Sequence, residues 1–322
     1  MARILTITLN PALDLNAELD RLAPGQVNRT DATSLEPAGK GINVARVLAR
    51  LGHEVTVSGL LGTDNAAPFE RLFADEGLTD RFVRVGGRNR VNIKLAERGG
   101  RITDINSAGF ASPGDALTRL QRELESLMPG HDVIVIGGSL PGQLVPAAVA
   151  DLVSQARRGG TPVWLDTSGD ALAEGLKAKP HGIKPNLDEL AEWAGQTLAG
   201  RQQVADVATA LRSQGIAQVV VSLGAEGVLW LSAEGDYQST PPPVSVGSTV
   251  CAGDTLLAAL VHGQLQSDQP AAEQLRFATA LSAECVRHAG VGDPAACDFH
   301  SLLDQTRVHP WPGENNNGET LS

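Results

Sequence analysis

Residues 248–255, with the sequence STVCAGDT, lead directly into an apolar run over residues 256–265 that predicts a helix. Small residues at the start of a helix leave backbone N–H groups free at its positive end, where phosphate oxygens can be held. Asp254 lies in that first turn, so its carboxylate can accept the proton of an attacking hydroxyl while the amides stabilise a transferred phosphoryl group. The alternative is that Asp254 only caps the helix, and this motif by itself favours capping.

A second glycine-rich turn, AGKGIN at residues 38–43, also opens a predicted helix. It is not a Walker A loop, because Gly41 stands where Ser or Thr would hold Mg²⁺ and no glycine lies five residues before Gly39. Lys40 offers a positive charge there, and Asn43 can donate and accept hydrogen bonds toward hydroxyls. An ordinary strand-to-helix turn with a solvated lysine fits this motif equally well.

A third polar group follows a short strand candidate at residues 181–183. It contains Lys184, Asn186 and Glu189, and the spacing of the last two puts them on one face of the first turn of the next helix. Mg²⁺ is held largely through waters and phosphate oxygens, so a sparse Asn and Glu pair is sufficient for it. A capping pair is the alternative.

Weaker signals lie at other strand ends and turns. Two glycine-rich turns follow strand candidates, GGSLPG at residues 137–142 and SLGAEG at residues 222–227, although small residues also serve ordinary turns. Arg90 and Lys94 lie at even spacing on one predicted strand and therefore on one face, either as anion ligands or as solvated charges. Asp14 follows the first predicted strand, where it can bind sugar hydroxyls or end a turn.

These motifs require strands and helices whose ends lie close together. Short β-rich apolar runs occur at residues 4–9, 55–61, 133–136, 163–165 and 219–223, and helical periodicity occurs at residues 42–51, 117–127, 147–156 and 204–211. Strands that alternate with helices predict βαβ units and a mostly parallel sheet with right-handed crossovers. In such sheets ligands lie beyond the carboxyl ends of the strands, where several of these motifs lie.

Two stretches, residues 13–37 and 88–105, break this alternation. Their alternating apolar and polar residues, with Gly and Asp turns, predict a small antiparallel appendage that includes a hairpin of residues 91–95 and 102–105. From Pro310 onward the chain has no periodicity, so we predict a flexible tail over residues 311–322.

The chain has 322 residues, of which 42% are hydrophobic and 20% charged, and this composition excludes intrinsic disorder for most of its length. It carries 26 Lys and Arg residues against 37 Asp and Glu residues, and the net charge of −11 repels nucleic acid and anionic membrane surfaces. We therefore expect neither as a partner. An anionic substrate needs a local basic pocket in such a chain.

Three cysteines, Cys251, Cys285 and Cys297, are odd in number and show no CxxC or Cys/His spacing. A disulfide framework or a zinc site is therefore not expected. The N-terminus enters an apolar alternating stretch with no cleavable leader, and no uncharged apolar run approaches the roughly 18 residues of a membrane span. We expect a cytoplasmic protein without a membrane anchor.

Taken in this order, the motifs resemble the ribokinase-like family of carbohydrate kinases, in its phosphofructokinase-B branch. The resemblance covers nearly the whole chain, from Arg3 to about Pro294. Besides the motifs above, it includes NPALD at residues 10–14, PGQVN at 24–28, RVNIK at 90–94, TDIN at 103–106 and LDTSG at 165–169. So many ordered motifs do not coincide by chance, and the capping and turn interpretations lose their weight beside them.

The resemblance implies a fold and an activity. The fold is a three-layer α/β/α sandwich with a small β-sheet lid, here one domain over residues 1–310 with lid strands within about 11–38 and 87–107. The implied activity is ATP- and Mg²⁺-dependent transfer of a phosphoryl group to the 6-hydroxyl of fructose 1-phosphate. Lid strands in this branch commonly pair across a dimer, so the resemblance also implies a homodimer.

The resemblance further implies roles for individual residues. By motif position, Asp254 resembles the catalytic base, and the amides of Ala252, Gly253 and Asp254 resemble an anion hole that begins at Cys251. The implied contacts to the sugar phosphate are Asp14, Gly39, Lys40, Asn43, Arg90 and Ser139. The implied nucleotide side is Lys184, Asn186, Glu189, Ser222, Gly224, Gly227, Ser248, Thr249 and Gly253, with Asn186 and Glu189 on the metal side.

Cys251 departs from the family pattern, which has glycine at that position. A cysteine there is strained if the backbone needs a positive φ, and the anion hole is then slightly altered. Because a thiolate is favoured at the positive end of a helix, we predict that Cys251 is more acidic and more reactive than Cys285 or Cys297, with Cys285 buried.

Other functions share part of this pattern. Tagatose-6-phosphate kinases and the minor 6-phosphofructokinases of the same family carry almost every motif, because all present a phosphorylated ketohexose to the same base. A sugar- or nucleotide-binding regulator without activity is a different class, and retention of Asp254 argues against it. A Rossmann dehydrogenase is disfavoured, since no GxGxxG follows a strand with an acidic residue suitably downstream.

Overall fold

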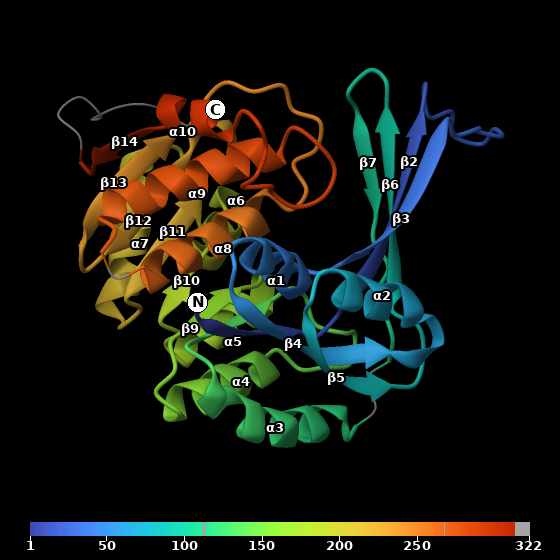
Figure 1. The fold of residues 1–322 in the computed structure, drawn as a ribbon, viewed down its shortest axis with the longest axis horizontal. Coiled ribbons are helices and arrows are strands. Elements are labelled where there is room, and N and C mark those ends of the chain that lie inside the picture. The colour runs from blue at the N-terminus through green and yellow to red at the C-terminus, as the bar shows by residue number, and fades with distance from the viewer. Residues whose placement is uncertain (112–113, 267, 313–322) are drawn as a thin grey trace.

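A ten-stranded sheet forms the centre of the molecule, in a computed structural model that describes residues 1–111, 114–266 and 268–312 (Figure 1). Seven neighbouring strands run parallel, in the order β5 (Thr79–Val85), β4 (Glu54–Gly62), β1 (Arg3–Thr8), β8 (Val133–Gly137), β9 (Val163–Asp166), β10 (Gly182–Ile183) and β11 (Gln218–Ser222). The central strands are nearly continuous apolar runs because both of their faces are buried.

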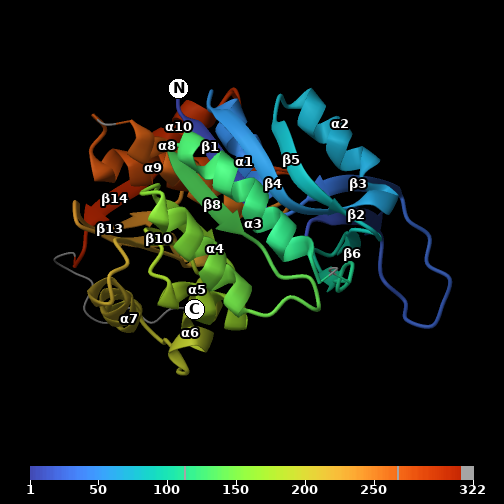
Figure 2. The same cartoon turned by 90° about the horizontal axis from the view of Figure 1, so that it is seen from below.

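Helices cover both faces of this sheet (Figure 1 and Figure 2). One face packs against α1 (Lys40–Arg50), α2 (Ala67–Asp75), α8 (Ala252–Leu265), α9 (Ala271–Cys285) and α10 (Phe299–Gln305). The other packs against α3 (Ala116–Leu127), α4 (Ala147–Arg158), α5 (Gly169–Lys177), α6 (Leu187–Ala194) and α7 (Arg201–Ser213). Short 3₁₀ turns lie at Thr63–Asn65, Met128–Gly130 and Gly224–Glu226. This arrangement confirms the predicted α/β/α sandwich.

The smaller, four-stranded sheet projects from this body, and we call it the lid sheet (Figure 1). Its order is β3 (Ala32–Ala38), β2 (Ala12–Leu19), β6 (Arg90–Glu97) and β7 (Ile102–Ile105). The predicted hairpin is confirmed as the antiparallel pair of β6 and β7. The prediction of a wholly antiparallel appendage is wrong, because the central pair, β2 and β6, is parallel. Both strands leave the large sheet and run outward in the same direction.

The C-terminal edge of the large sheet was not predicted. There β12 (Val228–Ser232), β13 (Gly235–Thr240) and β14 (Arg307–Pro310) add in antiparallel order. Pro310 pairs with Tyr237, and the Trp311 N–H donates to the carbonyl of Asp236 at 2.8 Å. The predicted flexible tail over residues 311–322 is therefore wrong for Trp311, while residues 313–322 of that tail lie outside the described residues. No helix within the described ranges is long and apolar enough to cross a membrane.

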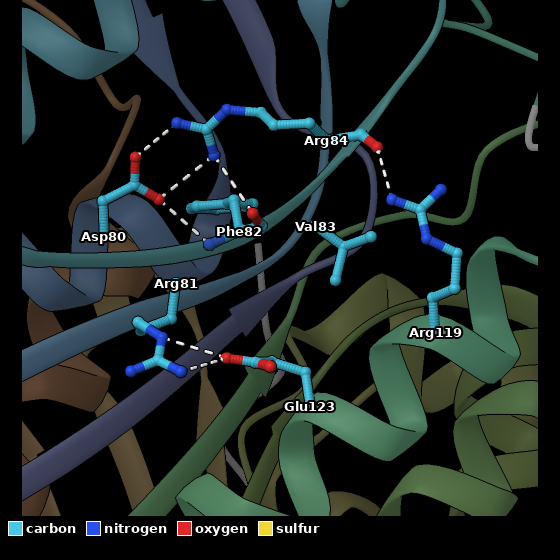
Figure 3. A pocket seen from close by; sticks show the side chains of 7 residues that line it. All are labelled: Asp80, Arg81, Phe82, Val83, Arg84, Arg119 and Glu123. Carbon is cyan, nitrogen blue, oxygen red and sulfur yellow. Dashed lines mark hydrogen bonds and ion pairs between the residues drawn. The ribbon is translucent and has the colours of Figure 1, made fainter.

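At the opposite edge of the sheet, charged side chains cover the free side of β5 (Figure 3). The Phe82 N–H donates to Asp80 Oδ1 at 2.9 Å, and the Phe82 carbonyl accepts from Arg84 Nη1 at 3.1 Å. Arg119, from α3, donates to the carbonyl of Arg84 at 3.0 Å. An unpaired strand edge is a template for pairing with another chain, and these contacts occupy the N–H of Phe82 and the carbonyls of Phe82 and Arg84.

Removing this cover should promote self-association through β5. We expect a variant with Asp80→Ala, Arg84→Ala and Arg119→Ala to form larger species than the wild type during mild heating, measured by light scattering after gel filtration. The control is Arg81→Ala with Glu123→Ala, which removes an ion pair between side chains from the same surface and uncovers no backbone group of β5. An unchanged mass distribution for the triple variant would show that these side chains do not protect the edge.

Candidate active site

The N-termini of α1 and α8, two helices that pack against each other, lie together at one end of the large sheet. Asn43 in the first turn of α1 donates to Asp254 Oδ2 in the first turn of α8, at 2.7 Å. Both side chains are buried. The structure thus joins two motifs that are 211 residues apart in the chain, and the hydrogen bond to the Asp254 carboxylate comes from another helix rather than from its own helix end.

Two glycines allow α1 to begin close to the end of β1. Gly39 precedes the helix with a φ of 145°, which disfavours side chains. At Gly41 a Cβ would lie 2.5 Å from Thr8 Oγ1 and 3.1 Å from the carbonyl oxygen of Ile7. This close approach of helix to strand fixes the position of Lys40, which stands between the two glycines.

The start of α8 presents backbone amides to the same place. Cys251 is the N-cap residue, with a φ of 66°, and Ala252, Gly253 and Asp254 form the first turn. The N–H groups of a first turn have no partners within the helix, so they are available to an anion. A Cβ on Gly253 would lie 3.0 Å from Lys184 Nζ, so the Lys184 ammonium group lies beside this helix start.

Asp166 at the end of β9 holds the two lysines of the site. Its Oδ1 lies 2.7 Å from Lys40 Nζ, and its Oδ2 lies 3.5 Å from Lys184 Nζ. Lys40 Nζ also lies 3.6 Å from Glu189 Oε1, so the interpretation of Lys40 as a solvated lysine is wrong. Sequence reasoning gave Asp166 no role, although a carboxylate that ends a buried apolar strand within the LDTSG motif was a usable signal.

Burial and charge together set the ionisation of this cluster. Burial, with a smaller contribution from Asp166, raises the pKa of Asp254 to about 6, against the opposing effects of Lys40, Asn43 and Lys184. Burial alone would lower the pKa of Lys40, but the carboxylates of Asp166, Glu189 and Asp254 outweigh it, and the pKa rises above its ordinary value. Burial likewise acts to raise the pKa of Asp166, but Lys184 and Lys40 hold it below its usual range.

Asn186 and Glu189 form a capping box at the start of α6. The Glu189 N–H donates to Asn186 Oδ1 at 2.8 Å, and the Asn186 N–H donates to Glu189 Oε2 at 2.9 Å. The alternative prediction that Asn186 and Glu189 form a capping pair is therefore confirmed. The other carboxylate oxygen, Glu189 Oε1, faces Lys40. Among the described residues, no group of three or more His, Cys, Asp or Glu side chains could hold a metal ion. The metal role of the pair stays a prediction.

The lid sheet contributes a second polar group. Asp14 accepts from Asn92 Nδ2 at 2.9 Å and pairs with Lys94 Nζ at 2.9 Å, so the interpretation of Lys94 as a solvated charge is wrong. Arg90 Nε donates to the carbonyl of Asn10 at 3.2 Å. Burial lowers the pKa of Arg90, and the nearby Asp14 partly opposes that shift. Arg90 shares its face of the sheet with Asp14, because Ala12 pairs with Arg90 and Asp14 with Asn92.

Asn10 links the lid group to Ser139. Its Nδ2 lies 3.3 Å from Ser139 Oγ, 3.1 Å from the Leu140 carbonyl and 3.2 Å from the Ala108 carbonyl. The side chain is buried, and its Oδ1 has no hydrogen-bond partner within the described residues. Sequence reasoning noted the NPALD motif but assigned Asn10 no role.

The turn over residues 222–227 lies next to the start of α6, because Ser222 forms a parallel bridge with Asn186. Gly224 and Gly227 both have positive φ, and a Cβ on Gly227 would lie 1.8 Å from the carbonyl oxygen of Ser239. Only glycine fits at that position. The structure therefore brings this turn together with the polar group of Asn186 and Glu189.

The segment before α8 is tied to the end of α9. Ser248 N–H donates to the carbonyl of Val286 at 3.0 Å, and Ser248 Oγ accepts from the Val250 N–H at 3.2 Å. Thr249, the next residue, is exposed. The contacts of Ser248 hold the approach to α8, whereas the predicted nucleotide role of Ser248 and Thr249 stays a prediction.

Cys251 has the predicted backbone strain but not the predicted acidity. Its φ of 66° lies in the left-handed region. Burial, with the charges of Asp254 and Cys285, raises the pKa of its thiol well above the ordinary value, so the prediction of an acidified cysteine is wrong. Desolvation in the helix-packed interior outweighs the favourable end of the helix. Cys285 is buried, as predicted.

This arrangement can deprotonate a hydroxyl and stabilise the phosphoryl group that it attacks. Asp254 is a buried carboxylate whose pKa lies just below neutral pH, as a general base requires. The amides at the start of α8 and the ammonium groups of Lys40 and Lys184 supply positive charge beside it.

Known proteins are similar to this chain in sequence and in fold. The family model described as "pfkB family carbohydrate kinase" matches residues 7–296. The 1-phosphofructokinase of Escherichia coli strain K12 is 44% identical over 310 residues, 96% of this chain and 99% of that protein. Phosphofructokinase-2 from Escherichia coli, in a tetrameric inhibited form, is 30% identical with a TM-score of 0.85, over 94% of this chain and 99% of that chain. Its complex with fructose-6-phosphate is 29% identical, with the same TM-score and coverage.

The environment of Cys251 leads to a prediction about thiol reactivity. In the native protein iodoacetamide should label the exposed Cys297 at least about tenfold faster than Cys251 or Cys285, because a thiol whose pKa is raised holds little thiolate. Mass-spectrometric mapping of the adducts over time gives the order. Cys251→Gly identifies the Cys251 adduct by its loss, and labelling of Cys251 as fast as Cys297 would restore the original expectation.

Proposed function

The chain belongs to the pfkB family of carbohydrate kinases, and from this membership we propose that it transfers a phosphoryl group from ATP to the 6-hydroxyl of fructose 1-phosphate. The product is fructose 1,6-bisphosphate. The choice of sugar phosphate is supported by the 1-phosphofructokinase that is 44% identical over nearly the whole chain. The observation that carries the chemistry is the buried Asp254 carboxylate at the start of α8.

Asp254 acts as the general base in this proposal. Its carboxylate takes the proton from the 6-hydroxyl as that oxygen attacks phosphorus. With a pKa of about 6 the side chain is mostly ionised at neutral pH yet basic enough to accept a proton. Asn43 binds Oδ2 and leaves Oδ1 for the hydroxyl.

During transfer the phosphoryl group carries negative charge that the protein must stabilise. The amides of Ala252, Gly253 and Asp254 and the ammonium groups of Lys40 and Lys184 are in place before the substrates arrive. Preorganised donors of this kind stabilise the transition state more than water does, because they need no reorganisation during the reaction. Ser222, Gly224 and Gly227, which lie beside Asn186, form the nucleotide side of this proposal.

Mg²⁺ fits this site only through few protein ligands. Glu189 Oε1 is the carboxylate oxygen that the capping box leaves unused, and it lies in the site with Lys40. Asn186 Oδ1 is already occupied by the Glu189 N–H. Mg²⁺ usually keeps several waters and binds substrate phosphates. When bound, it would neutralise charge on the phosphates of ATP.

The lid group binds the sugar phosphate in this proposal. Asp14 accepts from sugar hydroxyls, and Arg90 holds the phosphate that does not react, with Ser139 and Gly39 completing the contacts. A basic side chain is needed here because the net charge of the chain is −11. Tagatose-6-phosphate kinase and 6-phosphofructokinase activities remain the alternatives, and the related Escherichia coli phosphofructokinase-2 is described in complex with fructose-6-phosphate.

A coupled assay of ADP release separates these substrates. We expect kcat/KM with fructose 1-phosphate to exceed the values with fructose 6-phosphate and tagatose 6-phosphate. A higher value with either of the other sugars would reassign the substrate within the family. Binding of sugar phosphate without ADP release from any of the three would instead indicate a regulator.

Asp254→Asn should abolish turnover while leaving both substrates bound. The amide keeps the size of the side chain but cannot accept a proton, and a positioned base is worth about 10²- to 10⁴-fold in rate. Steady-state kinetics measure the loss of kcat, and calorimetry measures the binding of ATP and sugar phosphate. Retention of more than about a tenth of the wild-type kcat would remove Asp254 from the role of base.

The pH profile of the wild type is a second readout for the same assignment. A carboxylate with a raised pKa is protonated, and inactive as a base, below that pKa, so kcat/KM should fall below about pH 6. The hydrogen bond from Asn43 lowers the pKa of Asp254, so Asn43→Ala should move this limb to higher pH. A limb that stays in place would show that another group titrates.

We also infer that two copies of the chain associate through the outer face of the lid sheet. Leu15 pairs with Leu35 and with Ile93, and Ile93 pairs with Ile105, so one apolar row crosses all four strands. Leu35 is 50% and Ile105 52% exposed. An exposed apolar row on a sheet marks an interaction surface, and Asp14 and Arg90 lie on the opposite face.

Leu35→Asp with Ile105→Asp should therefore convert a dimer into monomers, because a buried unpaired charge opposes association. Sedimentation velocity measures the mass. Val145→Asp is the control, because Val145 is 62% exposed and lies before α4, away from the lid sheet. A double variant that keeps the wild-type mass would place the interface elsewhere.

A further inference from the structure

A pair of asparagines fastens the lid sheet to the large sheet at one chain crossing. Here the chain leaves β5, passes through residues 86–89 and enters β6 at Arg90. Asn89 is the last residue before the lid strand and is 2% exposed. Asn65 lies in the 3₁₀ turn that follows β4. Neither residue was singled out from the sequence.

The two carboxamides make reciprocal hydrogen bonds with the backbone. Asn89 Oδ1 accepts from the Gly62 N–H at 2.8 Å, and Asn89 Nδ2 donates to the Gly62 carbonyl at 2.9 Å. Asn65 makes the same pair of hydrogen bonds with the backbone of Asn89. Its Oδ1 accepts from the Asn89 N–H at 2.8 Å, and its Nδ2 donates to the Asn89 carbonyl at 3.1 Å. A further bond of 2.9 Å joins Asn89 Nδ2 to Asn65 Oδ1.

The backbones at this crossing are also in direct contact. A Cβ on Gly62 would lie 2.7 Å from the Gly87 carbonyl oxygen and 2.9 Å from the Asn89 nitrogen. The Asp64 N–H donates to the same Gly87 carbonyl at 3.0 Å. The start of β6 is therefore held rigidly against the end of β4, a strand of the large sheet.

Arg90 follows this attachment immediately. Its Nε donates to the carbonyl of Asn10, whose side chain in turn lies 3.3 Å from Ser139 Oγ. A shift of Asn89 would carry Arg90 with it, because the two residues share a peptide bond, whereas Asp254 and Lys184 stand on other elements. The attachment therefore acts on the site through Arg90.

We propose that Asn89, backed by Asn65, is a positioning residue that holds the Arg90 guanidinium where it binds the sugar phosphate. This inference rests on the proposed function, in which Arg90 contacts the phosphate that does not react. Asn89 touches neither substrate, and it acts by fixing the first residue of β6 against Gly62.

The kinetic expectation follows from that position. Asn89→Ala should raise KM for fructose 1-phosphate about tenfold, with kcat and KM for ATP changed by less than about twofold, because a displaced charged hydrogen-bond partner loses about 10- to 100-fold in binding. Asn65→Ala should act in the same direction and more weakly, since it leaves the bonds between Asn89 and Gly62 in place. Asn16→Ala is the control, because that lid carboxamide bonds to Ser34 Oγ.

A double-mutant cycle tests whether Asn89 acts through Arg90. Arg90→Ala should itself raise KM for the sugar phosphate, and adding Asn89→Ala to it should raise KM no further. Calorimetric Kd values for fructose 1-phosphate without ATP are measured in parallel, so the cycle is readable even if the chain phosphorylates another sugar. Thermal unfolding defines a temperature at which every variant is folded, and Asn65→Ala carries the test if Asn89→Ala does not fold.

Three results would overturn the inference. They are an unchanged KM and Kd for the sugar phosphate in Asn89→Ala, equal losses on the ATP and sugar sides, and full additivity with Arg90→Ala. Failure of the proposed function looks different, because it appears in the wild type as a preference for another sugar or as absence of ADP release.

Discussion

Two carboxylates, Asp166 and Asp254, are both buried and close enough to repel each other, and the rest of the site is arranged around that constraint. A buried charge is tolerated only when it is paired or hydrogen-bonded. Asp166 keeps its charge because Lys40 and Lys184 lie against it. Asp254 receives a hydrogen bond from Asn43 and the charges of Lys40 and Lys184, but burial and the charge of Asp166 outweigh them, so its pKa rises to about 6. Asp166 thereby stays ionised and holds the two lysines, whereas Asp254 is left able to exchange a proton.

This division of roles explains why elements far apart in the chain must meet. Lys40 and Asn43 start α1, Asp166 ends β9, and Asp254 starts α8. Gly41 lets α1 approach β1, and Gly253 leaves room for the Lys184 ammonium group. The glycines therefore contribute to the electrostatics of the site, because side chains at these positions would push the charged groups apart.

Much of the large sheet could be predicted from the sequence, because buried parallel strands are short apolar runs between helices. The strands after residue 227 were missed, since β13 and β14 carry polar residues and the antiparallel order of β12, β13 and β14 falls outside the βαβ pattern on which the prediction rested. The parallel pairing of β2 with β6 is a contact between distant segments that no local pattern encodes. Asp254 and Asn43 were predicted from motifs at helix starts, whereas Asp166 was not assigned a role.

Other errors share a physical cause. The acidity predicted for Cys251 considered the helix end alone, and burial, which the sequence does not display at that position, has the larger effect. Asn65 and Asn89 were not singled out, because their importance lies in bonds to backbone groups of other segments. Local patterns report propensity and charge, but desolvation and reciprocal bonding appear only when the chain is folded.

The lid sheet meets the body of the molecule along a single transverse row, since Ala12 is in register with both Ala38 and Arg90. An eight-residue strand such as β2 extends about 25 Å from that row. The lid sheet can therefore pivot about the row that contains Ala12. A rotation about that row moves Asp14, two residues away, much less than it moves Leu19 at the far end, so the far end can shift while the polar group near the base stays in place.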